Sequence, residues 1–160
     1  MNKLLLVIDV QNDFINDNTV MVKDKIDKLI ESNEYNNVVF TKFINNKNSI
    51  WYNKLNYEGC LLEAGQRIAV NTRNYPVFDK YTYSALSIEL KDYIEDNNIK
   101  SIYLCGFDTD ACIYKTALDL FDNNYNVYVL KNYTMSHKGE ELHKVFIDNL
   151  KRLIGKDHIV

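Results

Sequence analysis

Short apolar runs alternate with amphipathic helical segments along the chain, and this alternation is the feature that most restricts its fold. A near-continuous apolar run such as LLLVI at residues 4–8 is typical of a strand buried on both faces of a parallel sheet. Strands separated by helices are joined by right-handed crossovers. The pattern therefore predicts an α/β fold: a doubly wound, three-layer αβα domain around a central, mostly parallel sheet of five to six strands.

The expected elements follow one another without an internal repeat or a linker. Strands are predicted at residues 4–9, 37–44, 76–79, 101–105 and 126–130, with a short sixth at 158–160. Helices are predicted at residues 21–34, 84–97, 110–123 and 139–154. The Asn-rich stretch 45–75 is expected to be irregular, with one short helix.

Length and charge narrow the class of protein. A chain of 160 residues suits one domain, so residues 1–160 are predicted to form a single domain. The net charge of -3, with scattered basic residues, offers no field for nucleic acid or an anionic membrane. No stretch approaches the roughly 20 apolar residues that span a bilayer. Three cysteines without a CxxC pair or zinc-finger spacing indicate reduced thiols in a cytoplasmic protein.

One cysteine, Cys112 in LCGFDTDACIYKTAL, stands where an apolar strand gives way to a helix. Thr109 or Asp110 can cap this helix, which would put Cys112 in its first turn. The helix dipole and free N–H groups there favour a thiolate and can hold an oxyanion. Position alone leaves open that Cys112 is a small buried apolar residue.

An acid and an amine are expected at the same edge of the sheet as Cys112. The first strand ends in Asp9, and the third ends in Asp79 and Lys80; ligands of such sheets bind outside the carboxyl ends of the strands. Asp9 follows an apolar run and loses solvation unless it is paired, which makes it a candidate general base. The alternatives are a turn-forming aspartate and an ordinary surface lysine.

Four segments of the chain stand in a characteristic order: LLLVIDVQNDF, VFDKYTYSAL, LCGFDTDACIYKTALDLF and VYVLKNYTMSHKGEELHKVFIDNL. Together they resemble the isochorismatase-like cysteine hydrolases, a superfamily that includes nicotinamidases and related amidohydrolases. The resemblance implies a catalytic triad in which Cys112 attacks a carbonyl carbon, Asp9 moves the protons and Lys80 holds Asp9. It also implies a cis peptide between Phe107 and Asp108, which would help to form an oxyanion hole from the backbone N–H groups of Asp108 and Cys112.

The segment TKFINNKNSIWYNKLN departs from the nicotinamidases, because it contains no His, Asp or Glu where they have a metal-binding cluster. No metal and no other cofactor are therefore expected, and nicotinamide is not the expected substrate. The isochorismatases that cleave a vinyl ether lack the nucleophilic cysteine, so Cys112 argues against that reaction. The sequence predicts hydrolysis of a C–N bond in a small amide or carbamoyl-type substrate. The pocket wall is expected to include Gln11, Phe14, Trp51, Tyr81 and Ser84.

Two other functions stay open at this point. A catalytically silent member of the superfamily could bind a small molecule or act as an interaction protein. A thiol redox protein using Cys105 or Cys112 would lack a resolving CxxC partner. His137 and His143 are six residues apart and do not share a helix face, so they are not interpreted as a metal pair. A homo-oligomer is implied by the resemblance alone.

Overall fold

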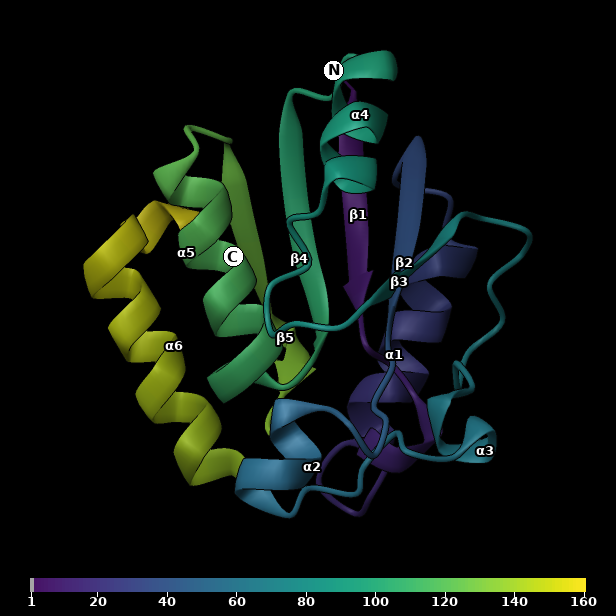
Figure 1. Ribbon diagram of the computed structural model, residues 1–160. Coiled ribbons are helices and arrows are strands. Elements are labelled where there is room, and N and C mark those ends of the chain that lie inside the picture. The colour runs from purple at the N-terminus through teal and green to yellow at the C-terminus, as the bar shows by residue number, and fades with distance from the viewer. Residues whose placement is uncertain (1) are drawn as a thin grey trace.

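The computed structural model describes residues 2–160 and contains one parallel sheet with the strand order β3-β2-β1-β4-β5 (Figure 1). The strands are β1 Lys3–Ile8, β2 Asn37–Phe43, β3 Val77–Lys80, β4 Ser101–Phe107 and β5 Val127–Met135. All neighbouring strands pair in parallel. The order reverses at β1, because β2 and β4 flank it on opposite sides. The predicted fold class is therefore confirmed, with a sheet of five strands.

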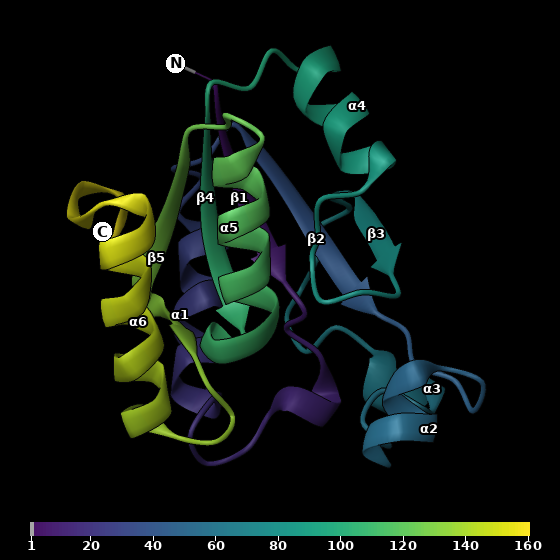
Figure 2. The same ribbon diagram turned by 60° about the vertical axis from the view of Figure 1, so that its left-hand side comes forward.

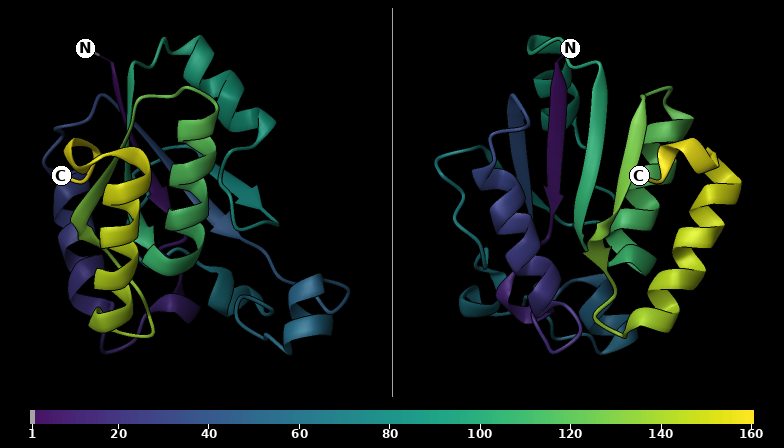
Figure 3. Two further views of the ribbon diagram at one scale, coloured as in Figure 1. Left: turned by 90° about the vertical axis from the view of Figure 1, so that its left-hand side faces the viewer. Right: turned by 180° about the vertical axis from the view of Figure 1, so that it is seen from behind.

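Helices cover both faces of this sheet (Figure 3). The α-helices are α1 Val20–Glu31, α2 Ile50–Leu55, α3 Glu63–Gln66, α4 Ile88–Asp96, α5 Tyr114–Asp122 and α6 Glu140–Ile154. Two 3-10 turns, η1 Asn12–Phe14 and η3 Lys156–His158, and a π-helical turn, η2 Thr109–Ile113, complete the elements. Among the described residues, no helix is long and apolar enough to cross a membrane.

The apolar core consists of two layers that share the strands. Leu4, Leu6 and Ile8 of β1 pack with the helices α4, α5 and α6, whereas Leu5 and Val7 pack with α1. All five side chains are fully buried, and each such burial contributes about 1.5–3 kcal/mol. The unbroken apolar run in the sequence thus reflects a strand that is covered on both faces.

Several predicted boundaries differ from the structure. The helix expected at 84–97 begins only at Ile88, because the Ser87 hydroxyl caps it by accepting the Leu90 N–H at 3.2 Å. The sixth strand expected at 158–160 is wrong: residues 156–158 form a 3-10 turn, and only Ile159 makes an isolated bridge to Val129. The stretch 45–75 contains two short helices, α2 and α3, which lie beyond the carboxyl ends of the strands (Figure 2).

Gly106 is the position in the sheet that tolerates no other residue. Its φ is +114°, and a Cβ there would lie 2.0 Å from the carbonyl oxygen of Ile8 on the neighbouring strand. Gly139 has a similar φ of +116°, but its nearest side-chain atoms would lie 3.9 Å from an added Cβ. Gly106 therefore combines a positive φ with a steric overlap, whereas Gly139 has the positive φ alone. A comparison of substitutions at the two positions isolates the cost of the overlap.

Replacement of Gly106 with alanine is expected to lower the free energy of unfolding by about 4 kcal/mol or more, or to prevent folding. Gly139→Ala is the matched control and should cost about 1–3 kcal/mol from backbone strain alone, because its φ of +116° and ψ of 177° lie in a region that is essentially restricted to glycine. Urea unfolding followed by circular dichroism measures both. Equal losses for the two variants would contradict the close approach of β4 to β1.

Candidate active site

Asp9, Lys80 and Cys112 come together at the carboxyl ends of the strands. Asp9 directly follows β1, Lys80 is the last residue of β3, and Cys112 lies in η2 after β4. The Lys80 Nζ lies 2.7 Å from Asp9 Oδ2 and 3.4 Å from Cys112 Sγ. The exposed fractions of the three residues are 0%, 5% and 7%. The three residues that the sequence singled out thus form one buried cluster.

The Asp9 carboxylate has a partner for each oxygen. Lys80 pairs with Oδ2, and the hydroxyl of Thr41 donates to Oδ1 at 2.7 Å. The same hydroxyl accepts the Asp9 N–H at 3.3 Å. Thr41 lies opposite Ile8 in the register of β1 and β2, which places it beside the end of β1. The sequence analysis missed Thr41, whose only signal was a hydroxyl within an apolar strand.

The Lys80 ammonium is enclosed by acceptors. It donates to the carbonyl oxygens of Thr82 at 2.7 Å and Tyr83 at 3.3 Å, and it lies 5.2 Å from the centroid of the Phe43 ring. Burial is the largest single cause and lowers the pKa of Lys80, but the charge of Asp9 and the hydrogen bonds to Asp9 and Cys112 together outweigh it and raise the pKa overall. The site therefore favours the protonated ammonium of Lys80.

Burial is the main cause that raises the pKa of the Cys112 thiol well above its ordinary value; the neighbouring Asp9 charge adds to it, while Lys80 opposes both. A helix N-terminus was expected to favour the thiolate, and the direction of this shift is the opposite, because burial penalises the charged form of the thiol.

The turn η2 is held differently from the predicted capped helix. Neither Thr109 nor Asp110 caps it: Asp108 occupies the N-cap position and makes no side-chain cap hydrogen bond. The Thr109 hydroxyl is instead hydrogen-bonded to His143 Nδ1 at 2.7 Å. Burial lowers the pKa of His143, so this contact is with a neutral imidazole. The peptide bond between Phe107 and Asp108 is cis.

A cavity of about 220 Å³ opens beside Cys112. Its apolar wall consists of Phe14, Phe43, Trp51, Leu55, Tyr57 and Tyr83. Its polar wall consists of Asp108, Asp110, Cys112, His137 and Lys138. The wall therefore combines an aromatic surface with charged groups on the side of the thiol.

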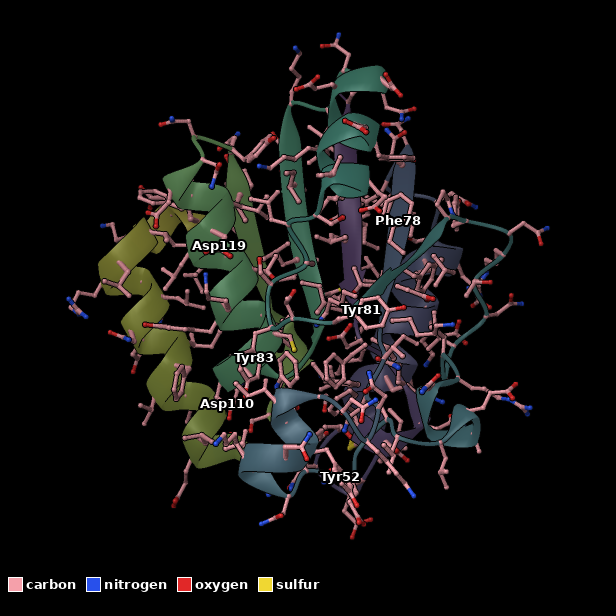
Figure 4. The ribbon with its side chains drawn as sticks, in the orientation of Figure 1. Tyr52, Phe78, Tyr81, Tyr83, Asp110 and Asp119 are labelled. Carbon is pink, nitrogen blue, oxygen red and sulfur yellow. The ribbon has the colours of Figure 1, made fainter. Side chains whose placement is uncertain are left out.

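Two of the predicted wall residues, Phe14 and Trp51, line this cavity. The Trp51 ring meets Phe43 and Tyr83 edge to face, with ring centroids 5.3 and 5.5 Å apart. Tyr83 rather than Tyr81 lines the wall, and Tyr81 is 57% exposed. Figure 4 shows both tyrosines on the segment after β3, with Tyr83 nearer to Asp110.

Gln11 and Ser84 do not line the cavity. The Gln11 amide is fully buried and binds backbone: it donates to the carbonyl oxygens of Phe43 and Gln66, each at 2.9 Å, and accepts the Phe43 N–H at 2.8 Å. These hydrogen bonds connect Gln66, in the segment 44–76, to Phe43 at the end of β2. The Ser84 hydroxyl accepts the Leu86 N–H at 3.2 Å in the turn before α4. Both were predicted as substrate contacts, and both stabilise the backbone instead.

Asp108 and His137 form a charged contact that the sequence analysis missed. The His137 backbone N–H donates to Asp108 Oδ1 at 2.9 Å, and its ring Nδ1 binds Asp108 Oδ2. Asp108 follows β4 and His137 follows β5, two strands that pair with each other. The sequence signal for this contact was that each of the two polar residues follows one of two neighbouring parallel strands. Within residues 2–160, no group of three or more His, Cys, Asp or Glu side chains is arranged to hold a metal ion.

The sequence as a whole is similar to one known protein family. A model of the isochorismatase domain matches residues 3–156. The chain belongs to the isochorismatase family. Isochorismatase family protein 2A of Dictyostelium discoideum is 39% identical over 82 residues, which cover 50% of this chain and 39% of that protein. The matches thus span well under half of the length of the curated relatives.

Solved structures share the fold over nearly the whole chain. The nicotinamidase PncA from Bacillus subtilis has a TM-score of 0.84 at 22% identity, with 97% of each chain covered. The N-carbamoylsarcosine amidase from Thermoplasma acidophilum has a TM-score of 0.83 at 20% identity, covering 97% of this chain and 94% of that one. This isochorismatase-family chain therefore has the αβα architecture of those proteins.

Lys80→Met should lower the free energy of unfolding by about 3 kcal/mol, because it leaves the Asp9 carboxylate buried without its cation. The double variant Asp9→Asn with Lys80→Met removes both charges and should recover much of this loss. Lys42→Met is the matched control, since Lys42 pairs with Asp79 at 3.2 Å on the surface and should contribute at most about 1 kcal/mol. Equal losses for Lys80→Met and Lys42→Met in urea unfolding would contradict the buried pair.

Alkylation of Cys112 by iodoacetamide should rise with pH only above about 8.5, the ordinary pKa of a free thiol. Asp9→Asn should shift the profile to lower pH, because the Asp9 charge raises the pKa of the thiol, and Lys80→Met should shift it to higher pH. Mass spectrometry of the peptide containing Cys112 follows the rate. A midpoint below 8.5 in the unsubstituted protein would contradict the protonated resting thiol.

Proposed function

We propose that this chain is a cysteine hydrolase that cleaves the C–N bond of a small amide or carbamoyl-type substrate through a thioester on Cys112. The observation that carries the proposal is a thiol in contact with a buried Lys80–Asp9 ion pair, at the wall of a cavity lined mostly by aromatic side chains. The solved structures with the same fold, which include a nicotinamidase and an N-carbamoylsarcosine amidase, support this class of reaction.

In the first step, Cys112 Sγ attacks the carbonyl carbon while its proton passes to the Asp9 carboxylate. The carbonyl π electrons move onto oxygen, so a tetrahedral adduct with an oxyanion forms. Lys80 stays positive throughout and stabilises the sulfur as its negative charge develops. Because the resting thiol is neutral, deprotonation and attack are coupled, and Asp9 is the group placed to accept the proton.

The oxyanion needs hydrogen-bond donors, and the backbone N–H groups of Asp108 and Cys112 are assigned to it. Both residues line the cavity. When the adduct collapses, the C–N bond breaks and Asp9 returns its proton to the leaving amine. Water then attacks the thioester with Asp9 as the base. This second step releases the carboxylic or carbamic acid and regenerates the thiol.

The cavity restricts the substrate to a small molecule. Its volume of about 220 Å³ and its aromatic wall of Phe43, Trp51 and Tyr83 suit a compact amide with a flat or apolar substituent. The chemistry assigned to Asp9, Lys80 and Cys112 moves protons and electron pairs only, so the proposal includes no cofactor.

Cys112→Ala is expected to reduce the release of ammonia from a panel of small primary amides and carbamoyl compounds by at least about 1,000-fold. The physical reason is that no other group of the site can form the thioester. Cys60→Ala is the matched control, because Cys60 is buried with its Sγ 3.9 Å from the carbonyl oxygen of Gly65 and is not part of the cavity wall, so turnover should be unchanged. Ammonia release that is the same in Cys112→Ala and the unsubstituted protein would rule out the proposal.

A further inference from the structure

The contact between His137 and Asp108 lies beside Cys112, but none of the proton transfers proposed above uses it. One residue, His137, holds both oxygens of the Asp108 carboxylate, through its backbone N–H at 2.9 Å and through its ring Nδ1. Asp108 is only 5% exposed, so its side chain has little other solvation. The segment after β5 thereby fixes the side chain of Asp108.

The backbone of Asp108 is fixed on its other side by η2. Its carbonyl oxygen accepts the N–H groups of Ala111 at 3.1 Å and Ile113 at 3.0 Å. These residues flank Cys112 in the chain. Asp108 is thus held between the turn that carries the thiol and the segment that carries His137. The two hydrogen bonds to its carbonyl oxygen hold the peptide group between Asp108 and Thr109, and the Asp108 N–H lies in the preceding peptide group, so they act on that N–H through the Cα of Asp108.

We propose that His137 is a positioning residue that, through the Asp108 carboxylate, fixes the Asp108 N–H as a donor to the oxyanion. The inference rests on the proposed function, since it assumes that Cys112 attacks a carbonyl group. It adds a residue that touches neither the thiol nor the reacting carbon. Loss of His137 is therefore expected to weaken stabilisation of the adduct without changing the reactivity of the thiol.

The charge of His137 makes this contact depend on pH. The charged groups that act on its ring are Asp108, Asp110 and Lys138, and the ring also packs 6.3 Å from the centroid of Phe14. The hydrogen bond to Asp108 is the main cause that raises the pKa of His137 above its ordinary value of about 6.5. Burial also raises the pKa of the Asp108 carboxyl, so the contact is charge-assisted between the pKa of Asp108 and the raised pKa of His137, and it weakens as the pH rises through the latter.

Benzaldehyde is a probe that isolates the oxyanion hole. The thiol adds to its carbonyl: the S–C bond forms, the π electrons move onto oxygen, and the thiol proton reaches that oxygen through Asp9. The oxygen of the resulting hemithioacetal occupies the place assigned to the oxyanion. Iodoacetamide is the comparison probe, since alkylation displaces iodide and creates no oxyanion at the carbon that is attacked.

Two variants test the inference: His137→Ala, and His137→Asn, in which the amide N–H can replace the Nδ1–H donor. The control variant is His158→Gln. His158 binds the carbonyl oxygen of Val127 at the opposite end of β5. His137→Ala should weaken benzaldehyde binding about 10- to 100-fold, the effect of one charge-assisted hydrogen bond, with alkylation changed by less than about twofold. His137→Asn should recover part of the affinity, and His158→Gln should match the unsubstituted protein.

The pH dependence provides a second readout. Benzaldehyde affinity of the unsubstituted protein should fall as the pH rises through the raised pKa of His137, and this fall should be absent in His137→Asn. Unchanged benzaldehyde affinity in the His137 variants, or equal losses for both probes, would overturn the inference. If His137→Ala does not fold, the benzaldehyde affinity of His137→Asn and the pH dependence of the affinity in the unsubstituted protein test the inference. An unsubstituted protein that forms no adduct overturns the proposed function itself.

Discussion

The ion pair between Lys80 and Asp9 is the interaction on which the rest of the site depends. Its atoms lie 2.7 Å apart, and its side chains are 4% and 0% exposed. Such burial costs several kcal/mol per ion and is compensated only when every charge has further partners. Thr41 on one side and the carbonyl oxygens of Thr82 and Tyr83 on the other supply them. The site therefore holds a carboxyl group and an ammonium group against each other in a buried place.

The neutral state of Cys112 follows from this pair. A thiol beside a cation alone would ionise easily, but here the cation is shared with a carboxylate, and burial further raises the pKa of the thiol. In the proposed reaction, the nucleophile therefore forms as the carbonyl carbon is attacked, and the proposed oxyanion donors stabilise the charge that develops on the carbonyl oxygen. A raised pKa of the thiol also predicts slow alkylation and oxidation of the sulfur near neutral pH.

The sequence predicted the parts of the site that follow from strand ends. Asp9 was found because it ends an apolar run and Lys80 because it stands at a strand end, and parallel strands place their carboxyl ends at one edge of the sheet. The hydrogen-bond partners of the site side chains were harder to predict, because they come from segments that are distant in the sequence. Asp108 and His137 are 29 positions apart, and Gln11 reaches Phe43 across 32. The pKa of Cys112 could not be inferred either, since it depends on how completely water is excluded.

The central claim is that Cys112 carries the acyl group during turnover. Acid quenching of the unsubstituted protein during hydrolysis of the best amide of the panel, followed by peptide mass mapping, tests it most directly. The account predicts the mass of the acyl group on the peptide that contains Cys112, and its release by hydroxylamine, as expected of a thioester. Turnover of the amide with the acyl mass on another residue would contradict the account.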